Sequence, residues 1–478
     1  MYELSKQLID VLDEKKINYC HWKSNLLLNE ALNGYDDLDI LVGRKDIVKF
    51  ERALLSLGFK EASNKYISFS SIKHFYGFDA QSGNILHLHV YYQIKTGPSW
   101  TKSMRFDFEE YFLQNTIIHK SGMKVPAKHI ELVLFVLRVM LKYSKVNEYI
   151  LINKEHQRTL QEIDYLMDSI DEEKLEMFLH QYFDNISKKD FFDYIEVIKH
   201  SSFLDKYIKA NLLKNKLSKY KNLNFIQESI NNILQFCYRV INKLFLKQKK
   251  KLHSAGTLIV IAGLDATGKT TITTELKKWL GKNFTVSLIH FGKPPSTVLT
   301  YPINLAIKMM KKKSSDTVLR SSIKNEKSQK SLLYIIRQVV LAYDRYSLIR
   351  KYWRKTSNGE IVLCDRYKSE DYGVMDSRRL KPDNYTGFKK KLAQFENRLY
   401  EQMPKPDIMF YLTVPVEVAV VRNENRIKDG KESEEFMRIR HAENQNLTYR
   451  AKVYSKIDTN REYQEVIQEI KSKIWDIL

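Results

Sequence analysis

Hydrophobic positions along the chain follow three successive patterns. Within residues 1–125, apolar residues at helical spacing precede short apolar runs, which indicates an α+β domain. From Pro126 to about residue 250, apolar residues keep helical spacing without turns marked by glycine or proline, which predicts a helical region over 126–250. The last part of this region, 232–246, is amphipathic and basic, so it fits packing against a neighbouring domain or contact with a lipid surface.

From residue 255 onward, short apolar runs alternate with longer amphipathic stretches. The apolar runs predict strands at 258–262, 285–290, 361–364, 408–414 and 453–457. The stretches that separate and follow them predict helices, including 331–353 and 463–477. Such alternation indicates a doubly wound parallel sheet with helices on both faces and ligands at the carboxyl ends of its strands. We therefore predict an α/β domain over 255–478.

Composition narrows the class of protein. The chain has 478 residues, of which 43% are hydrophobic, so two or three well-buried domains are expected. It contains no run of about 18 uncharged apolar residues and its first residues lack the plan of a signal peptide. The three cysteines, Cys20, Cys237 and Cys364, form no disulfide framework or zinc motif. We therefore predict a cytoplasmic protein without a transmembrane segment.

The net charge of +22 indicates anionic partners, although a generally lysine-rich composition would produce the same value. Nucleotides, nucleic acids and acidic membrane surfaces are all anionic partners that a chain of this charge could bind. Because no nucleic-acid recognition motif accompanies it, we do not expect nucleic acid as a partner.

A phosphate-binding loop directly follows the first strand of the α/β region. The sequence from Gly263 to Thr270 matches the pattern G-x-x-x-x-G-K-[ST] between a buried strand and a helical stretch. In such a loop, backbone N–H groups surround phosphate oxygens, Lys269 reaches the β- and γ-phosphates, and Thr270 offers its hydroxyl to Mg²⁺. We therefore expect ATP to be held by Gly263, Asp265, Ala266, Thr267, Gly268, Lys269, Thr270 and Thr271.

Charged side chains follow two other predicted strands. Asp365 and Arg366 end the strand 361–364, where the carboxylate suits Mg²⁺ or an acceptor and the guanidinium suits a transferring phosphoryl group. Arg422 and Arg426 share one helix face after the strand 408–414, as a basic lid over phosphates would. Both groups also have a purely structural interpretation. Asp365 and Arg366 would form an ion pair at the end of a strand, and Arg422 and Arg426 would lie on a solvated charged helix.

Taken in order along the chain, these features resemble the thymidylate kinase family. The matching parts are the loop 263–271 with its acidic Asp265, the triplet Asp365-Arg366-Tyr367, the strand after Pro406-Asp407 with its Arg-x-x-x-Arg lid, and a last strand ending in Ile457-Asp458. The resemblance implies transfer of the ATP γ-phosphoryl group, with Mg²⁺, to a nucleoside monophosphate, normally thymidylate. It also implies a homodimer, because thymidylate kinases are commonly dimers.

The resemblance further assigns roles to individual residues. Arg366 would bridge the donor and acceptor phosphates, with Tyr367 beside it at the acceptor site, and Asp265 would lie near the acceptor sugar. Arg345, in the segment Ala342-Tyr-Asp-Arg345, would address the acceptor base. Because the loop itself lacks an arginine, Arg422 and Arg426 would supply the catalytic positive charge.

Three departures from the family pattern leave the acceptor open. Leu341 stands where the family usually stacks an aromatic ring on thymine, and such a ring contributes about 1 kcal/mol. The segment 368–379 differs from the family's sequence and adds charge beside the acceptor site. The segment 290–295 resembles divergent thymidylate kinase-like proteins found beside surface-polysaccharide genes. A sugar or glycan intermediate is therefore the alternative phosphoryl acceptor.

The N-terminal domain carries a second motif. Lys23-Ser24 precedes Asp37-Leu-Asp39, and carboxylates at i and i+2 share one face of a strand, where they suit Mg²⁺. This arrangement resembles the nucleotidyltransferase superfold, whose members carry a Gly-Ser turn before an Asp-x-Asp strand. The strand expected to supply a third carboxylate instead carries His87 and His89, which are strand histidines or metal ligands.

Three interpretations of residues 1–125 follow. They form an active nucleotidyltransferase, a nucleotide-binding or regulatory module that has lost catalysis, or an unrelated fold with an accidental Asp-x-Asp. For the whole chain, the leading hypothesis is an ATP-dependent nucleoside monophosphate kinase. The alternatives are a kinase for a sugar or glycan acceptor and a nucleotide-binding regulatory protein.

Overall fold

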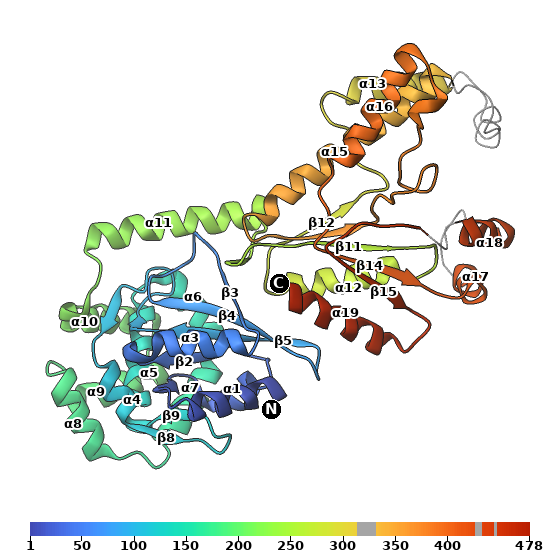
Figure 1. Ribbon diagram of the computed structural model, residues 1–478. Helices are drawn as coiled ribbons and strands as arrows, with labels where there is room; N and C mark the ends of the chain where they lie inside the picture. Colours follow the sequence, from blue (N-terminus) through green and yellow to red (C-terminus); the bar gives the residue numbers. More distant parts are fainter. Residues whose placement is uncertain (313–330, 426–432, 444–446) are drawn as a thin grey trace. The chain divides into compact units, whose positions relative to one another are not determined.

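The chain divides into two compact units, Met1–Gln248 and Lys249–Leu478 (Figure 1). Each unit has a hydrophobic core of its own. The computed structural model describes residues 1–312, 331–425, 433–443 and 447–478.

The first unit is built around a mixed sheet with strand order β1-β2-β5-β4-β3. These strands are β1 (Tyr19–His21), β2 (Leu38–Val42), β3 (Lys60–Ser63), β4 (Ile72–Asp79) and β5 (Asn84–Tyr91). Strands β2 and β5 run parallel, which places Asp39 opposite His89, whereas the other neighbours run antiparallel. Helices α1 (Glu3–Glu14) and α3 (Ile47–Ser56) bury their apolar faces against this sheet.

Helices contribute most of a second core in the first unit. They are α5 (Lys128–Tyr143), α6 (Val146–Lys154), α7 (His156–Met167), α8 (Glu172–Tyr182), α9 (Lys188–His200) and α10 (Phe203–Lys216). Helix α5 is apolar nearly all round and is buried among α6 to α10, as expected for a helix in the middle of a core. Side chains of the sheet, including Trp22 and Tyr91, belong to the same core, so the predicted helical region packs directly on the α+β part.

Shorter elements complete the first unit. They are η1 (Asn25–Leu27), α2 (Leu28–Ala31), η2 (Arg44–Asp46), β6 (Ile94–Thr96), β7 (Met104–Phe106), α4 (Glu109–Gln114), β8 (Thr116–Ile118), β9 (Lys124–Pro126) and η3 (Ser218–Tyr220). The pairs β6–β7 and β8–β9 are antiparallel hairpin-like ladders that lie between the sheet and α5 along the chain.

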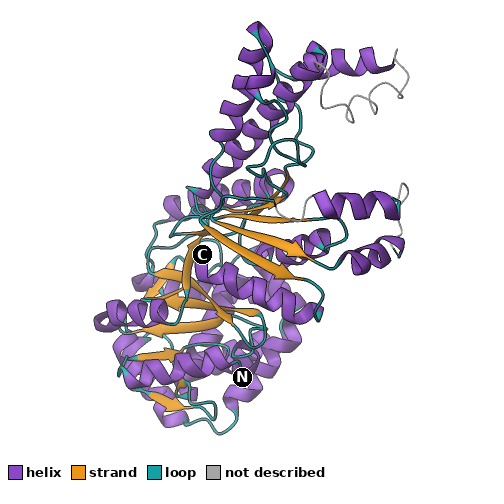
Figure 2. Ribbon diagram, turned by 45° about the vertical axis from the view of Figure 1, so that its right-hand side comes forward, coloured by secondary structure: helices purple, strands orange, loops and turns teal. Residues whose placement is uncertain are grey.

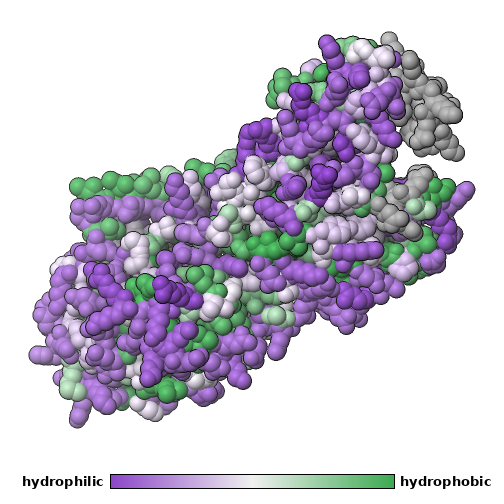
Figure 3. All heavy atoms as spheres, in the orientation of Figure 1, coloured by the Kyte–Doolittle hydropathy of each residue, from purple (hydrophilic) through white to green (hydrophobic). Residues whose placement is uncertain are grey.

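Helix α11 (Phe225–Ile241) and the following π-helical turn η4 (Asn242–Leu246) form the amphipathic segment expected near 232–246. One side of α11 faces its own unit, where the ring of Tyr238 stacks on Tyr66 at 4.5 Å. Apolar side chains on the other side, such as Ile233 and Leu234, are exposed and form a green band along α11 in Figure 3.

The second unit confirms the predicted α/β fold. Its sheet has the order β12-β13-β11-β14-β15, and all neighbouring strands are parallel. The strands are β11 (Leu258–Gly263), β12 (Val286–His290), β13 (Ile361–Asp365), β14 (Ile408–Thr413) and β15 (Val453–Asp458). All five lie within a residue or two of the predicted positions. A short strand, β10 (Lys251–Leu252), precedes them.

Helices cover both faces of this sheet (Figure 2). The apolar sides of α15 (Leu332–Thr356) and α16 (Gly387–Glu401) pack on one face, and α12 (Lys269–Gly281) and α19 (Tyr463–Ile477) lie on the other (Figure 1). The remaining elements are α13 (Tyr301–Lys312), η5 (Pro382–Asn384), α17 (Val416–Glu424) and α18 (Glu434–Glu443). No helix among the described residues is long and apolar enough to cross a membrane.

Candidate active site

The phosphate-binding loop lies between β11 and α12, at the carboxyl edge of the sheet. Gly263 has φ of 150°, and a Cβ atom there would lie 2.5 Å from the carbonyl oxygen of Leu412 on the neighbouring strand. Gly268 has φ of 86° directly before α12. Lys269 is buried, and its ammonium donates to the carbonyl oxygens of Gly263, at 3.0 Å, and Leu264. Glycine is therefore required at the start of the loop by close packing and backbone conformation together.

The three threonines of the loop differ in their exposure to solvent. Thr267 is buried, and its hydroxyl donates to the carbonyl oxygen of Leu264 at 2.8 Å, which stabilises the turn. Thr270 and Thr271 are exposed in the first turn of α12. Ala266 has φ of 61° and packs with Met437 of α18. The loop is thus fixed by a hydrogen bond at Thr267 and exposed to solvent at Thr270.

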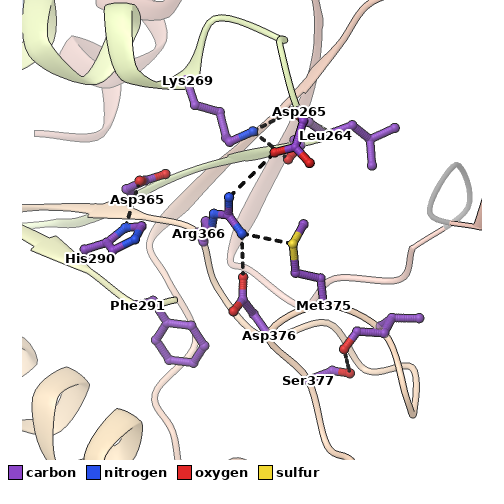
Figure 4. A network of polar contacts seen from close by, with 12 residues as sticks. Leu264, Asp265, Lys269, His290, Phe291, Asp365, Arg366, Met375, Asp376 and Ser377 are labelled. Carbon is purple, nitrogen blue, oxygen red and sulfur yellow. Dashed lines mark hydrogen bonds and ion pairs between the residues drawn. The ribbon is translucent and has the colours of Figure 1, made fainter. Parts of the chain in front are cut away.

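Arg366 faces this loop from the end of β13 (Figure 4). Its Nη2 lies 3.7 Å from Oδ1 of Asp265, and its Nη1 lies 3.6 Å from Oδ2 of Asp376. The backbone of Arg366 has φ of 73°, and its N–H donates to the carbonyl oxygen of Ile261 at 3.0 Å. Two carboxylates on opposite sides therefore orient the guanidinium, while the strand edge holds its backbone.

Asp376 links Arg366 to a buried arginine of α15. Its Oδ1 lies 2.6 Å from Nη2 of Arg345, and both side chains are almost fully buried. Arg345 also donates to the hydroxyl of Tyr400 at 2.7 Å and to the carbonyl oxygen of Phe291 at 3.3 Å. With each nitrogen of its guanidinium bonded, Arg345 anchors the segment that carries Asp376.

Asp365 occupies the last position of β13, opposite Ile261 of β11 and His290 of β12. Its Oδ2 lies 2.9 Å from Nδ1 of His290. Among the described residues, Oδ1 of Asp365 and Nε of Arg366 are buried without a hydrogen-bond partner. The structure therefore places one unsatisfied carboxylate oxygen and one unsatisfied guanidinium N–H next to the phosphate-binding loop.

Sequence analysis missed a second arginine at the site. Arg440 of α18 lies with its Nη1 2.9 Å from Oδ2 of Asp265, and its Nη2 contacts the sulfur of Met375 at 2.9 Å. Arg366 contacts the same sulfur at 2.9 Å. No local signal distinguishes Arg440 from its neighbour Arg438, which instead pairs with Glu434 at 2.9 Å.

The other predicted site residues lie elsewhere or outside the described residues. Tyr367 is buried in the core, where its hydroxyl donates to the carbonyl oxygen of Pro404 and burial raises its pKa well above the usual value. Arg422 of α17 donates to the carbonyl oxygen of Thr459 at 2.8 Å. Arg426 lies outside the described residues.

Residues 261–470 match the family model of thymidylate kinase. This stretch contains the loop, Asp365, Arg366 and α18. A thymidylate kinase of Prochlorococcus marinus (strain NATL1A) is 28% identical over 230 residues, which is 46% of this chain and 96% of that protein. An uncharacterized ATP-binding protein of Escherichia coli (strain K12) is 23% identical over 226 residues, covering 45% of this chain and 86% of that protein. The second unit is therefore a P-loop nucleotide kinase-like domain.

The predicted acidic pair of the first unit is closely surrounded by cations and histidines. Oδ1 of Asp39 lies 2.7 Å from Nζ of Lys23 and 3.1 Å from Nδ1 of His89, and Asp37 lies 2.5 Å from Nδ1 of His87. Burial raises the pKa of Asp39, but Lys23 and His89 outweigh it and hold that pKa well below its ordinary value. Burial disfavours the charged form of His89 as well, and this lowers the pKa of His89 to about 4.

The ion pairs of Asp37 and Asp39 occupy carboxylate oxygens that the predicted Mg²⁺ site would need. Among the residues with described positions, no group of three or more His, Cys, Asp or Glu side chains is placed to hold a metal ion. Mg²⁺ binding by Asp37 and Asp39, and the resemblance of residues 1–125 to nucleotidyltransferases, stay predictions. The sequence did not single out His74, whose ring stacks on that of His89 at 4.5 Å and completes the histidine face of the sheet.

We predict that Asp376→Ala destabilises the second unit by about 3–5 kcal/mol, because it leaves the buried guanidinium of Arg345 without its carboxylate. Asp376→Asn should cost less, since the amide oxygen still accepts a hydrogen bond from Arg345. Urea unfolding followed by circular dichroism measures both. Asp383→Ala, at an exposed aspartate of η5, is the control and should change the unfolding free energy by less than about 0.5 kcal/mol. Equal stability of Asp376→Ala and Asp383→Ala would contradict the anchoring role.

Gly263→Ala should destabilise the same unit by about 1–3 kcal/mol, because the added Cβ would clash with the carbonyl of Leu412. Gly281→Ala is the matched control. It lies at the end of α12, a Cβ there meets nothing within 4 Å, and helix propensity favours alanine by about 0.8–1.0 kcal/mol. Thermal unfolding of the two variants should shift the transition in opposite directions, and a shift in the same direction would refute the packing argument.

Proposed function

We propose that the second unit transfers the γ-phosphoryl group of ATP to a nucleoside monophosphate, with thymidylate as the acceptor. The observation that carries this proposal is the guanidinium of Arg366, which two carboxylates orient toward the phosphate-binding loop. Phosphoryl transfer needs little covalent chemistry from the protein, because positioning and neutralisation of charge account for most of the catalysis. An arginine fixed between Asp265 and Asp376 supplies both.

The residues of the site divide these tasks. Backbone N–H groups of the loop and the ammonium of Lys269 hold the β- and γ-phosphates of ATP. Arg366 stabilises the negative charge of the transferring group, and its unpartnered Nε–H provides a further donor. Arg440, on α18 next to the loop, adds a second positive charge on the other side of Asp265. Closure of α18 over the loop would exclude water from the transfer.

Magnesium fits the oxygen groups at this edge of the sheet. The exposed hydroxyl of Thr270 and the unsatisfied Oδ1 of Asp365 are hard oxygen ligands of the kind that Mg²⁺ prefers. These two residues would hold the ion. When bound, Mg²⁺ would supply positive charge that offsets the negative charge of the transferring phosphoryl group. His290 orients Asp365 through its other oxygen.

The surroundings of Arg345 favour a second candidate acceptor. The family resemblance assigns Arg345 to the acceptor base, but here its guanidinium bonds Asp376, Tyr400 and Phe291 and is almost fully buried. An acceptor without a pyrimidine ring, such as a sugar or glycan intermediate, would not need that arginine. Either acceptor places the activity in the cytoplasm, where ATP is available, and the three free cysteines fit a reducing compartment.

Lys269→Ala should lower kcat/KM for phosphoryl transfer by at least about 100-fold, because the variant loses the charge that binds the β- and γ-phosphates. Lys277→Ala removes an exposed lysine of the same helix and should leave turnover within about twofold of the wild type. Release of ADP in the presence of Mg·ATP and thymidylate measures both variants.

The same assay separates the two acceptors. Turnover that depends on both thymidylate and Lys269 supports the proposal. Turnover with a panel of monosaccharides and no response to thymidylate would favour the second candidate. Equal turnover of Lys269→Ala and Lys277→Ala would exclude the loop as the kinase site.

Arg440→Ala should reduce kcat about tenfold or more, because the site loses a positive charge that lies beside Asp265. Arg438→Ala is the matched control, since Arg438 lies two residues away on α18 and pairs with Glu434 and Glu417 instead. Steady-state kinetics with varied ATP measures the effect. If the two variants lose activity equally, Arg440 acts only through the stability of α18.

A further inference from the structure

The first unit contains a polar pocket of about 220 Å³ that the kinase site does not involve. Its walls come from the loop between β1 and β2, including Ser24 and Asp37, and from helices α5 and α7. Arg138 and Lys142, one turn apart on α5, line the pocket together with His21 and Glu162. The pocket therefore combines two cations of a central core helix with polar groups of the sheet edge.

Three cations lie close to two aromatic rings, and one of these cations, Arg138, lines the pocket. The guanidinium of Arg138 lies 5.3 Å from the ring centre of Trp22, and the ammonium of Lys23 lies 5.4 Å from the same ring. Lys23 and Lys102 lie 5.1 Å and 5.8 Å from the ring centre of Tyr91. Trp22 and Tyr91 are themselves in edge contact, with ring centres 4.9 Å apart. The cations consequently share one small region of the core.

Most of these cations form no ion pair with a carboxylate of the described residues. Lys23 pairs with Asp39 at 2.7 Å, but within the described part of the chain no carboxylate lies within 4.0 Å of Lys102, Arg138 or Lys142. Burial, together with repulsion among the cations, lowers the pKa of Lys102 to about 7 and that of Lys142 to about 8. Repulsion among these cations destabilises the fold, and a bound anion beside Arg138 and Lys142 would reduce that repulsion.

Apart from Glu155, the acidic groups of the pocket are paired with cations or histidines or have a raised pKa. Asp36 pairs with Arg158 at 2.9 Å, while Asp37 and Asp39 pair with His87 and Lys23. Burial raises the pKa of Glu162. Glu155, like Asp36 and Asp37, is an exposed acid of the pocket, and no ion pair is formed by Glu155 with any described residue. An anion that enters would therefore meet Arg138 and Lys142, which have no carboxylate within 4.0 Å among the described residues.

A buried histidine adds a neutral acceptor. Nδ1 of His21 lies 2.6 Å from Oδ1 of Asn25, and because that oxygen only accepts hydrogen bonds, Nδ1 carries the proton. Burial lowers the pKa of His21, so the ring is neutral and its Nε2 is an acceptor. This Nε2 is buried without a hydrogen-bond partner among the described residues. It can accept a hydrogen bond from a ligand hydroxyl.

We propose that this pocket is a binding site for a small molecule that carries a phosphate group, held by Arg138 and Lys142, and a hydroxyl group, bound by His21. A guanidinium and an ammonium on successive turns of one helix suit the charge and the several oxygens of a phosphate. Sugar phosphates and nucleotides both have this chemistry. The proposal does not depend on the kinase activity of the second unit.

Isothermal titration calorimetry of the full-length protein tests the proposal. The probes are inorganic phosphate, ribose 5-phosphate and deoxythymidine monophosphate. We expect ribose 5-phosphate to bind more tightly than inorganic phosphate, because it adds hydroxyl groups. The double variant R138Q/K142Q should weaken its binding tenfold or more. Because the second unit is proposed to bind thymidylate as well, only the part of each binding signal that R138Q/K142Q removes is compared between ribose 5-phosphate and the nucleotide. The tighter of the two distinguishes a sugar phosphate site from a nucleotide site.

Two controls assign the binding to this pocket. The double variant K45Q/K49Q removes two exposed lysines at the same i, i+4 spacing on the surface of the first unit and should bind as the wild type does. Lys269→Ala, in the phosphate-binding loop of the second unit, should also retain the binding. Loss of ribose 5-phosphate binding in Lys269→Ala, or unchanged ribose 5-phosphate binding in R138Q/K142Q, would overturn the proposal, as would no binding of any probe at millimolar concentration.

A stability measurement separates ligand binding from a structural role. The double variant R138Q/K142Q removes two charges that repel Lys23 and Lys102. Without ligand, it should therefore unfold at the same temperature as the wild type or at a higher one. Ribose 5-phosphate should raise the unfolding temperature of the wild type but not that of the variant. If R138Q/K142Q does not fold, Lys142→Gln alone should weaken binding at least threefold, and unchanged binding in that folded variant would refute the proposal.

Discussion

The parallel register of β11 and β13 is the constraint on which the kinase-like site depends. It sets Ile261 opposite Asp365, and the carbonyl of Ile261 accepts the backbone N–H of Arg366 at 3.0 Å. Because the phosphate-binding loop begins two residues after Ile261, the same register brings that loop and Arg366 to one edge of the sheet. Parallel strands end together at their carboxyl ends, so groups far apart in the chain meet there.

Ion pairs between side chains then fix the positions of the charged groups that the register brings to this edge of the sheet. Asp376 joins the buried Arg345 to Arg366, and Asp265 lies between Arg366 and Arg440. Charges alternate along this network, which holds each guanidinium in place without neutralising it fully. An arginine arranged in this way is preorganised for phosphate, because little reorganisation is needed when a ligand binds.

The first unit distributes its charges differently. Its conspicuous carboxylates, Asp37 and Asp39, are paired with His87, His89 and Lys23, whereas no carboxylate of the described residues lies within 4.0 Å of Arg138 or Lys142 on α5. Among the described residues, the buried polar atoms of the pocket without a hydrogen-bond partner include Nε2 of His21 and Oε1 of Glu162. Both units thus hold arginine and lysine side chains at a polar site, although on different folds and with different residues.

Local patterns in the sequence were sufficient for much of the second unit. Strand positions, the parallel α/β fold and the phosphate-binding loop depend on apolar periodicity and on glycines at fixed spacing, and these signals lie within short stretches of chain. Asp365 and Arg366 could be placed at a strand end for the same reason. Asp265 and Arg366, which the sequence assigns to one site, lie 3.7 Å apart, while their roles at that site stay predictions.

Other features depend on contacts between residues distant in sequence, which no local pattern encodes. Arg440 meets Asp265 only because α18 packs on the loop through Met437. Tyr367 faces the core although it belongs to the same triplet as Arg366. The cations around Trp22 come from separate segments that converge when α5 packs on the sheet. Sequence by itself thus determined the fold and the phosphate loop of the second unit, whereas tertiary packing decided which charged groups have partners and which remain available for a ligand.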